Sequence, residues 1–260
     1  MSEPDDTAPE APKSTPKVPG REALRAPPPK RFYKAVSVAE ADGGYQILLD
    51  GRAVRTPKKL HLTVPTRSLA EAIASEWAAQ GEHIDPATMP LSKLAITAID
   101  GVTGTMTEVA ADIVHFAGSD LICYRAEAPE ALAEIQAAAW DPVLRWVEEA
   151  SGARFFLAEG VMPVTQSPEA LSRFADLVAP FGAFALASLH VMTTLTGSAF
   201  LAMAVARGHL TPEEAWAKAH VDEDWQIARW GVDVEAADRR ARRRTEMLAA
   251  AQFLNLLEAA

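Results

Sequence analysis

The sequence predicts an α+β protein in which a small N-terminal β-rich domain, a meander, precedes a larger all-helical domain. Three observations lead to this prediction. Apolar and polar residues alternate between residues 31 and 66, as they do in half-buried strands. From residue 105 onward apolar residues recur at helical spacing instead. The chain has 260 residues, 49% of them hydrophobic, which is enough for one large or two medium domains. We therefore expect a β-rich domain over 31–100 and a helical domain over 101–260.

A tail of residues 1–30 precedes these domains. It is rich in proline, has no apolar segment of the kind that a secretory signal needs, and contains five acidic residues, whereas mitochondrial transit peptides are poor in acids. We expect a disordered tail. The single cysteine, Cys123, excludes an internal disulfide and suits a reducing compartment. Together these features indicate a cytoplasmic protein of bacterial origin.

The β-rich domain is expected to contain four strands and one helix. Asp50-Gly51 is a strong signal for a two-residue hairpin turn. The four strands are predicted over Phe32–Val38, Tyr45–Leu49, Ala53–Thr56 and Leu60–Val64. The period then changes to that of a helix over 67–80, and Ser68 with Glu71 fits a capping box at its start.

Residues from 105 onward are expected to be almost entirely helical, with one exception. A stray strand is possible over Val161–Thr165. Asp141-Pro142 is expected to interrupt the helix that begins at Pro129, because proline cannot donate a backbone hydrogen bond. The predicted helices include those around Ile113, over 129–139 and 141–149, after Ser167-Pro168, over 183–195 and 197–207, over 211–231, and from Val234 to the end.

The segment Leu177–Ala206 carries no charged side chain, which raises the question of a membrane span. Prolines, glycines and a central group of serines and threonines punctuate it, and no cluster of lysine or arginine marks either end. These features favour two closely packed helices buried in a protein core. We expect no stable membrane insertion.

An acid-rich helix is predicted over Thr211–Gly231. On a helical wheel, Glu223 falls in the middle of an apolar stripe formed by Trp216, His220, Ile227 and Trp230, whereas the neighbouring acids point away. A carboxylate in that position must be paired, protonated or used in function. An ion pair with a buried arginine and a functional role are both open. The spacing of His220 with Glu223 or Asp224 also allows a metal ligand pair, although no second ligand motif accompanies it.

No catalytic motif is found in the chain, so an enzyme is not the default interpretation. Serine-hydrolase, phosphate-binding, dinucleotide-binding and CxxC patterns are all missing from the sequence. The net charge of −10 argues against general nucleic-acid binding, and the arginine run 239–244 is typical of a solvated helix face. A metal-dependent hydrolase that uses His220, Glu223 and Asp224 is the alternative. We expect no cofactor and no bound metal.

Four segments, taken in order, resemble a known family. They are residues 89–100, 119–125, 140–146 and 222–231. Together they are similar to the assembly chaperones for the catalytic head of F-type ATP synthase, which occur in mitochondria and alphaproteobacteria. The resemblance covers about residues 31–257, but residues 232–238 lack an aromatic residue that the family often carries there.

The resemblance implies a function without catalysis or cofactor. It implies a chaperone that holds the free alpha subunit of the synthase until the beta subunit replaces it. The partner-binding residues that it implies are Asp222, Glu223, Asp224 and Trp225, and the functionally important glutamate of the family falls on Glu223. We expect a monomer when the protein is free, and no nucleic-acid partner.

Overall fold

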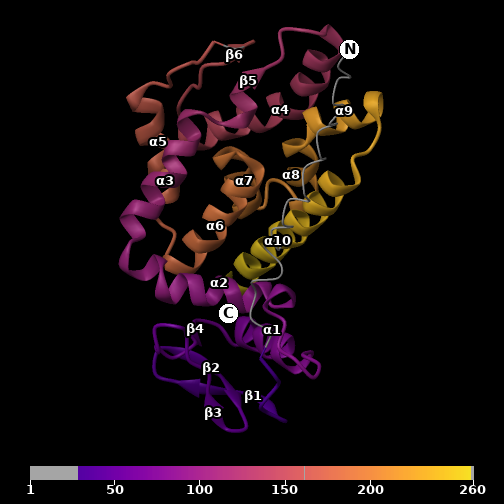
Figure 1. Ribbon diagram of the computed structural model, residues 1–260. Coiled ribbons are helices and arrows are strands. Elements are labelled where there is room, and N and C mark those ends of the chain that lie inside the picture. The colour runs from indigo at the N-terminus through magenta and orange to yellow at the C-terminus, as the bar shows by residue number, and fades with distance from the viewer. Residues whose placement is uncertain (1–28, 161, 259–260) are drawn as a thin grey trace, which may run out of the picture.

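The computed structural model describes residues 29–160 and 162–258. The α+β class and the order of its parts are confirmed, because a small sheet lies at one end of the molecule and helices build the rest (Figure 1). Of the predicted tail, residues 1–28 lie outside the described residues. The backbone of its last two residues pairs with the folded part of the chain. Ile84 N donates to Pro29 O at 2.8 Å, and Lys30 and His83 form an isolated antiparallel β-bridge.

The sheet is antiparallel and is built around its second strand. Its strands are β1 (Val36–Ala41), β2 (Gly44–Leu49), β3 (Arg52–Ala53) and β4 (Thr63–Val64). β1 pairs with β2 along its length, and β3 and β4 pair with two halves of the other edge of β2. Each of the four predicted strands overlaps an observed one, but β1 is shifted from Phe32–Val38 to Val36–Ala41. The strands predicted over Ala53–Thr56 and Leu60–Val64 are reduced to the two residues each of β3 and β4. Gly44 has a φ of +146°, and a Cβ there would lie 2.2 Å from Val64 O, so the site requires glycine.

Helix α1 (Arg67–Ala78) covers this sheet. Its N-cap is Thr66, whose Oγ1 accepts from Leu69 N at 3.2 Å, so the predicted capping box at Ser68 and Glu71 is wrong. The Thr66 hydroxyl also donates to Leu256 O at 2.6 Å, which joins the sheet region to the last helix of the chain.

The remaining elements are mainly helices. In chain order they are η2 (Pro86–Thr88), α2 (Pro90–Asp100), η3 (Val102–Gly104), α3 (Met106–Gly118), η4 (Leu121–Cys123), β5 (Tyr124–Arg125), α4 (Glu130–Ser151), β6 (Ala158–Glu159), α5 (Pro168–Val178), α6 (Ala183–Thr196), α7 (Ala199–Ala206), α8 (Pro212–Ala219), α9 (Val221–Trp230) and α10 (Val234–Glu258). Three expectations about them were wrong, and the third, at α8 and α9, is described with the candidate site.

The first correction concerns α4, which runs through Pro142 without a break. Trp140, Val143 and Val147 on one face of α4 are all fully buried, and this burial outweighs the backbone hydrogen bond that proline cannot make. The second concerns the strand predicted over 161–165. Residues 162–165 form no strand, and the short strand β6 instead ends at Glu159 and pairs in parallel with β5.

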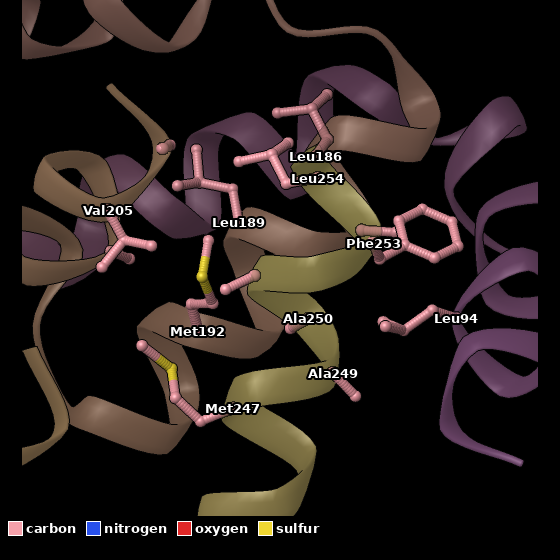
Figure 2. Close-up of a cluster of buried hydrophobic side chains, with 14 of the residues drawn as sticks. Leu94, Leu186, Leu189, Met192, Val205, Met247, Ala249, Ala250, Phe253 and Leu254 are labelled. Carbon is pink, nitrogen blue, oxygen red and sulfur yellow. The ribbon is translucent and has the colours of Figure 1, made fainter. Parts of the chain in front are cut away.

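The uncharged segment forms the two predicted buried helices, α6 and α7, at the centre of the helical region. Leu186, Leu189 and Met192 of α6 pack with α10, where Met247 lies near Met192 (Figure 2). The hydroxyl of Ser188, one of the polar residues in this segment, donates to Ala250 O of α10. None of the helices in residues 29–160 and 162–258 combines the length and the apolar composition that a transmembrane span needs.

A buried carboxylate, Asp120, joins η4 to the start of α7. Its Oδ1 accepts from Ser198 Oγ at 2.6 Å and from Ile122 N at 3.2 Å, and its Oδ2 accepts from Phe200 N at 3.0 Å. The side chain is fully buried. Burial raises the pKa of Asp120 to about 7, against the opposing effect of these hydrogen bonds.

Candidate client-binding groove between α9 and α10

The acid-rich segment forms two helices rather than the single helix predicted. The capping box of Thr211 and Glu214 is confirmed at the start of α8. The break comes at His220, whose imidazole Nδ1 donates to Trp216 O at 2.7 Å. This is the carbonyl that the backbone N–H of His220 would bind in a continuous helix. That N–H turns instead to Ala217 O, and α9 begins at the next residue, Val221.

The predicted position of Glu223 inside a buried apolar stripe is therefore wrong. The side chain of Glu223 is 56% exposed, and Trp230 at the end of α9 is 77% exposed. Only Trp216 and His220 of the predicted stripe are buried. The helical wheel assumed one axis over 211–231, and the break at His220 changes the direction in which the later residues point.

Glu223 and Asp224 share one arginine from α10. Arg240 Nη1 lies 2.5 Å from Asp224 Oδ1, and Arg240 Nε lies 3.8 Å from Glu223 Oε2. The hydrogen bond that Arg240 donates to the Asp224 carboxylate raises the pKa of Arg240 further above its usual value. An arginine partner for Glu223 was one of the expected alternatives, but both acids are more than half exposed, so this pairing is a surface network rather than a core ion pair.

The other two predicted site residues face different neighbours. Asp222 Oδ1 accepts from Gln136 Nε2 of α4 at 2.7 Å, and the buried Gln136 also accepts from Ala126 N through its Oε1 at 2.7 Å. Trp225 is half-buried, and the Arg229 guanidinium lies 3.1 Å from the centroid of its ring. Asp222 thus fastens α9 to α4. The four predicted residues share a helix but do not converge on a single point.

A groove of about 470 Å³ separates α9 from the first turns of α10. We call it the α9–α10 groove, and Glu223 and Arg240 are both on its walls. It is lined by His220, Glu223, Gln226, Ile227, Trp230, Gly231, Asp233, Ala236, Ala237, Arg239, Arg240 and Arg243. Sequence reasoning missed the contribution of α10, because the arginine run was interpreted as a solvated face. The mixture of alanine and arginine at helical spacing was the available signal for a lined surface.

His220 at the base of the groove is a structural residue at neutral pH. Burial lowers the pKa of His220 below its usual value, so the ring is neutral, and Nδ1 carries the proton that Trp216 O accepts. Nε2, which lies 3.9 Å from Glu223 Oε2, is then unprotonated and forms no ion pair. Among the described residues no group of three or more His, Cys, Asp or Glu side chains could hold a metal ion, so the hydrolase alternative lacks a ligand set.

Comparison with known proteins decides the family. Residues 30–148 match the profile of the ATP12 chaperone protein family. The crystal structure of Atp12 from Paracoccus denitrificans is 41% identical, with a TM-score of 0.84 over 88% of this chain and 98% of that one. The chain belongs to the ATP12 chaperone family. The resemblance drawn from the four sequence segments is thereby confirmed.

Two further relatives support the assignment of the chain to the ATP12 family. A protein of Agrobacterium tumefaciens of known structure is 49% identical, with a TM-score of 0.87 over 94% of this chain and 92% of that one. The mitochondrial protein atp12 of Schizosaccharomyces pombe is 24% identical over an alignment of 220 residues that covers 80% of this chain and 76% of the relative. The likeness therefore extends well beyond the residues that the family profile matches.

Proposed function

We propose that this protein is a molecular chaperone for the assembly of the catalytic head of F-type ATP synthase. In this proposal it holds the free alpha subunit, as a monomer in the bacterial cytoplasm, until the beta subunit replaces it. The observation that carries the proposal is the 41% identity to a solved Atp12, of which this chain covers 98%. The bacterial origin of that relative supports the compartment.

The physical need for such a chaperone is clear. A subunit of an obligate hetero-oligomer exposes a large apolar interface before its partner arrives, and that surface promotes self-association. A chaperone must cover this surface yet release it to the true partner. Charged groups beside apolar contacts provide selectivity without excessive affinity. The α9–α10 groove has this composition, because both apolar and charged side chains line it.

We assign the partner-binding role to Asp222, Glu223, Asp224 and Trp225. Two of them contact the client and two position the helix, as their contacts indicate. Glu223 and Asp224 present exposed carboxylates in the first turn of α9 and contact the client directly. Asp222, through its hydrogen bond to Gln136, and the half-buried Trp225 keep α9 in position.

Binding of purified chain to isolated alpha subunit tests the proposal. Size-exclusion chromatography should show a complex that disappears when beta subunit is added, and light scattering should show less aggregation of the alpha subunit. Glu223→Lys should weaken binding by about tenfold or more, because a contact charge is reversed. Failure of the unmodified chain to bind alpha subunit would overturn the proposed function.

The matched control is Glu169→Lys. Glu169 is also an exposed acid in the first turn of a helix, α5, so both variants lose a similar favourable interaction with a helix N-terminus. The two proteins should therefore melt at similar temperatures. Only Glu223→Lys should bind the alpha subunit less tightly, and an equal effect of both variants would remove Glu223 from the interface.

A further inference from the structure

An exposed apolar turn borders the α9–α10 groove. Trp230 is 77% exposed, Val232 62% and Val234 71%, and all three lie where α9 ends and α10 begins. Ile227 of α9 and Ala237 of α10, which line the groove from its two sides, continue this apolar character. Soluble monomers rarely expose large apolar side chains next to one another unless the surface serves an interaction. In Figure 1 this turn lies at the edge of the helical region, away from the sheet.

The α10 wall of the groove carries three arginines, and two of them, Arg239 and Arg243, have guanidinium groups without a strong ion pair in the part of the chain that the structure describes. Arg240 is engaged by Asp224 and Glu223, as described above. Within residues 29–160 and 162–258, the one ion pair of Arg239 is a 3.7 Å contact with Glu235, in which the side chains are 60% and 90% exposed, and such a pair is weak. Arg243 Nη2 donates to Leu195 O at 2.9 Å and has no ion-pair partner among the described residues.

These two observations specify the chemistry of an occupant. We propose that the α9–α10 groove binds an amphipathic segment of the client that presents an apolar side chain next to a carboxylate. The apolar side chain packs against Trp230 and Ile227. The carboxylate accepts hydrogen bonds from Arg239 and Arg243, whose planar groups suit this geometry. The proposal rests on the proposed function, because it names the part of the client that the groove recognises.

Charge complementarity favours an acidic segment over a basic one. The whole chain carries a net charge of −10, so it repels acidic molecules in general. The residues of α10 from Val234 to Glu246 reverse this locally, since five arginines there outnumber three acids. An acidic segment is therefore attracted to the α10 wall in particular, whereas Glu223 and Asp224 of α9 contact cationic or hydrogen-bond-donating groups of the client outside that segment.

Two variants separate the apolar and the charged contributions. Trp230→Ala should weaken binding of the isolated alpha subunit by about tenfold at both low and high salt, because burial of an aromatic side chain is insensitive to screening. Arg243→Glu should weaken it by a similar factor at low salt and by less at high salt. Phe156→Ala and Arg173→Glu are the matched controls, since Phe156 is 53% exposed and Arg173 is an exposed helical arginine on α5. Neither control should change binding.

A synthetic peptide tests the chemistry of the occupant without the alpha subunit. A helical peptide of leucine, alanine and glutamate should bind the unmodified chain, whereas the same peptide with lysine in place of glutamate should bind at least tenfold more weakly. Equal or stronger binding of the lysine peptide overturns the proposal, and so does normal alpha-subunit binding by Trp230→Ala and Arg243→Glu. If the unmodified chain binds the glutamate peptide but no alpha subunit, the proposed function fails and the chemistry of the groove stands.

Discussion

Replacing Asp120 with asparagine should change how the stability of this protein depends on pH. The carboxyl group is fully buried, and its pKa in the folded protein is raised to about 7. In the unfolded chain an aspartate has a pKa of about 3.9. Between these values the folded state keeps a proton that the unfolded state has lost. The contribution of Asp120 to stability is therefore greatest below pH 4 and is lost as the pH rises to 7.

The size of the effect follows from that difference. Between pH 5 and the folded pKa of about 7, the carboxyl group is ionised in the unfolded state but still protonated in the folded state. Over these two pH units the free energy of unfolding falls by about 1.4 kcal/mol per unit. The parent should therefore lose about 3 kcal/mol relative to Asp120→Asn, whose amide cannot ionise. For a protein of this size that is about 6–12 °C in melting temperature. At pH 5 the variant should be less stable by about 1–3 kcal/mol, because an amide cannot accept every hydrogen bond that Oδ1 accepts from Ser198 and Ile122.

Thermal melts at pH 5, 6, 7 and 8 measure the gap in melting temperature between the parent and Asp120→Asn. The parent should be the more stable protein at pH 5, and this gap should narrow or reverse as the pH rises. Asp176→Asn is the control, since Asp176 is an exposed acid on α5. This substitution should change the melting temperature by the same amount at pH 5 and at pH 8. A gap that stays constant, or that widens with pH, would show that the N–H donors around Asp120 outweigh its desolvation and hold it ionised.

Two other substitutions test local features of the fold. Gly44→Ala should destabilise the protein by about 2–4 kcal/mol, because its Cβ would lie 2.2 Å from a β4 carbonyl oxygen at a φ of +146°. Gly43→Ala, with open space around it, should cost about 1 kcal/mol. Equal losses of stability in chemical denaturation would contradict the steric argument. Gln136→Leu should cost about 2–3 kcal/mol, because it leaves Ala126 N without its acceptor and releases Asp222, and an unchanged midpoint would show that α9 is held by other contacts.

The sequence alone was sufficient where the signal is local. The helices α5 and α8 begin where Ser167 and Thr211 predict, because a side-chain cap and a following proline act within one turn. The buried pair α6 and α7 was predictable because a long uncharged segment with small polar residues suits a core. The resemblance to the chaperone family also rested on short segments read in order, and the comparisons bear it out.

The sequence failed where a contact between distant residues, or one side chain, decided the outcome. The strands β5 and β6 have two residues each, and the whole of α4 separates them in the sequence. No periodicity therefore marks them. The break at His220 depends on one imidazole taking a carbonyl from the backbone. Arg240 meets Glu223 only because the turn after α9 brings the start of α10 back towards it. Glu223 was therefore selected with an argument about burial that is wrong, and its partner-binding role stays a prediction.

The two walls of the groove are held with unequal strength, and this has a measurable consequence. α9 is fastened to α4 through Asp222, whereas the buried residues of α10 begin only at Met247. The thirteen residues from Val234 to Glu246 therefore depend largely on surface contacts, and an isolated helix of that length is marginal in water. Amide hydrogen exchange should be at least tenfold faster over 234–246 than over 247–256, and it should slow when alpha subunit binds. Equal protection along α10 in the free protein would mean that this wall is already rigid before the client binds, and that binding carries no cost of ordering it.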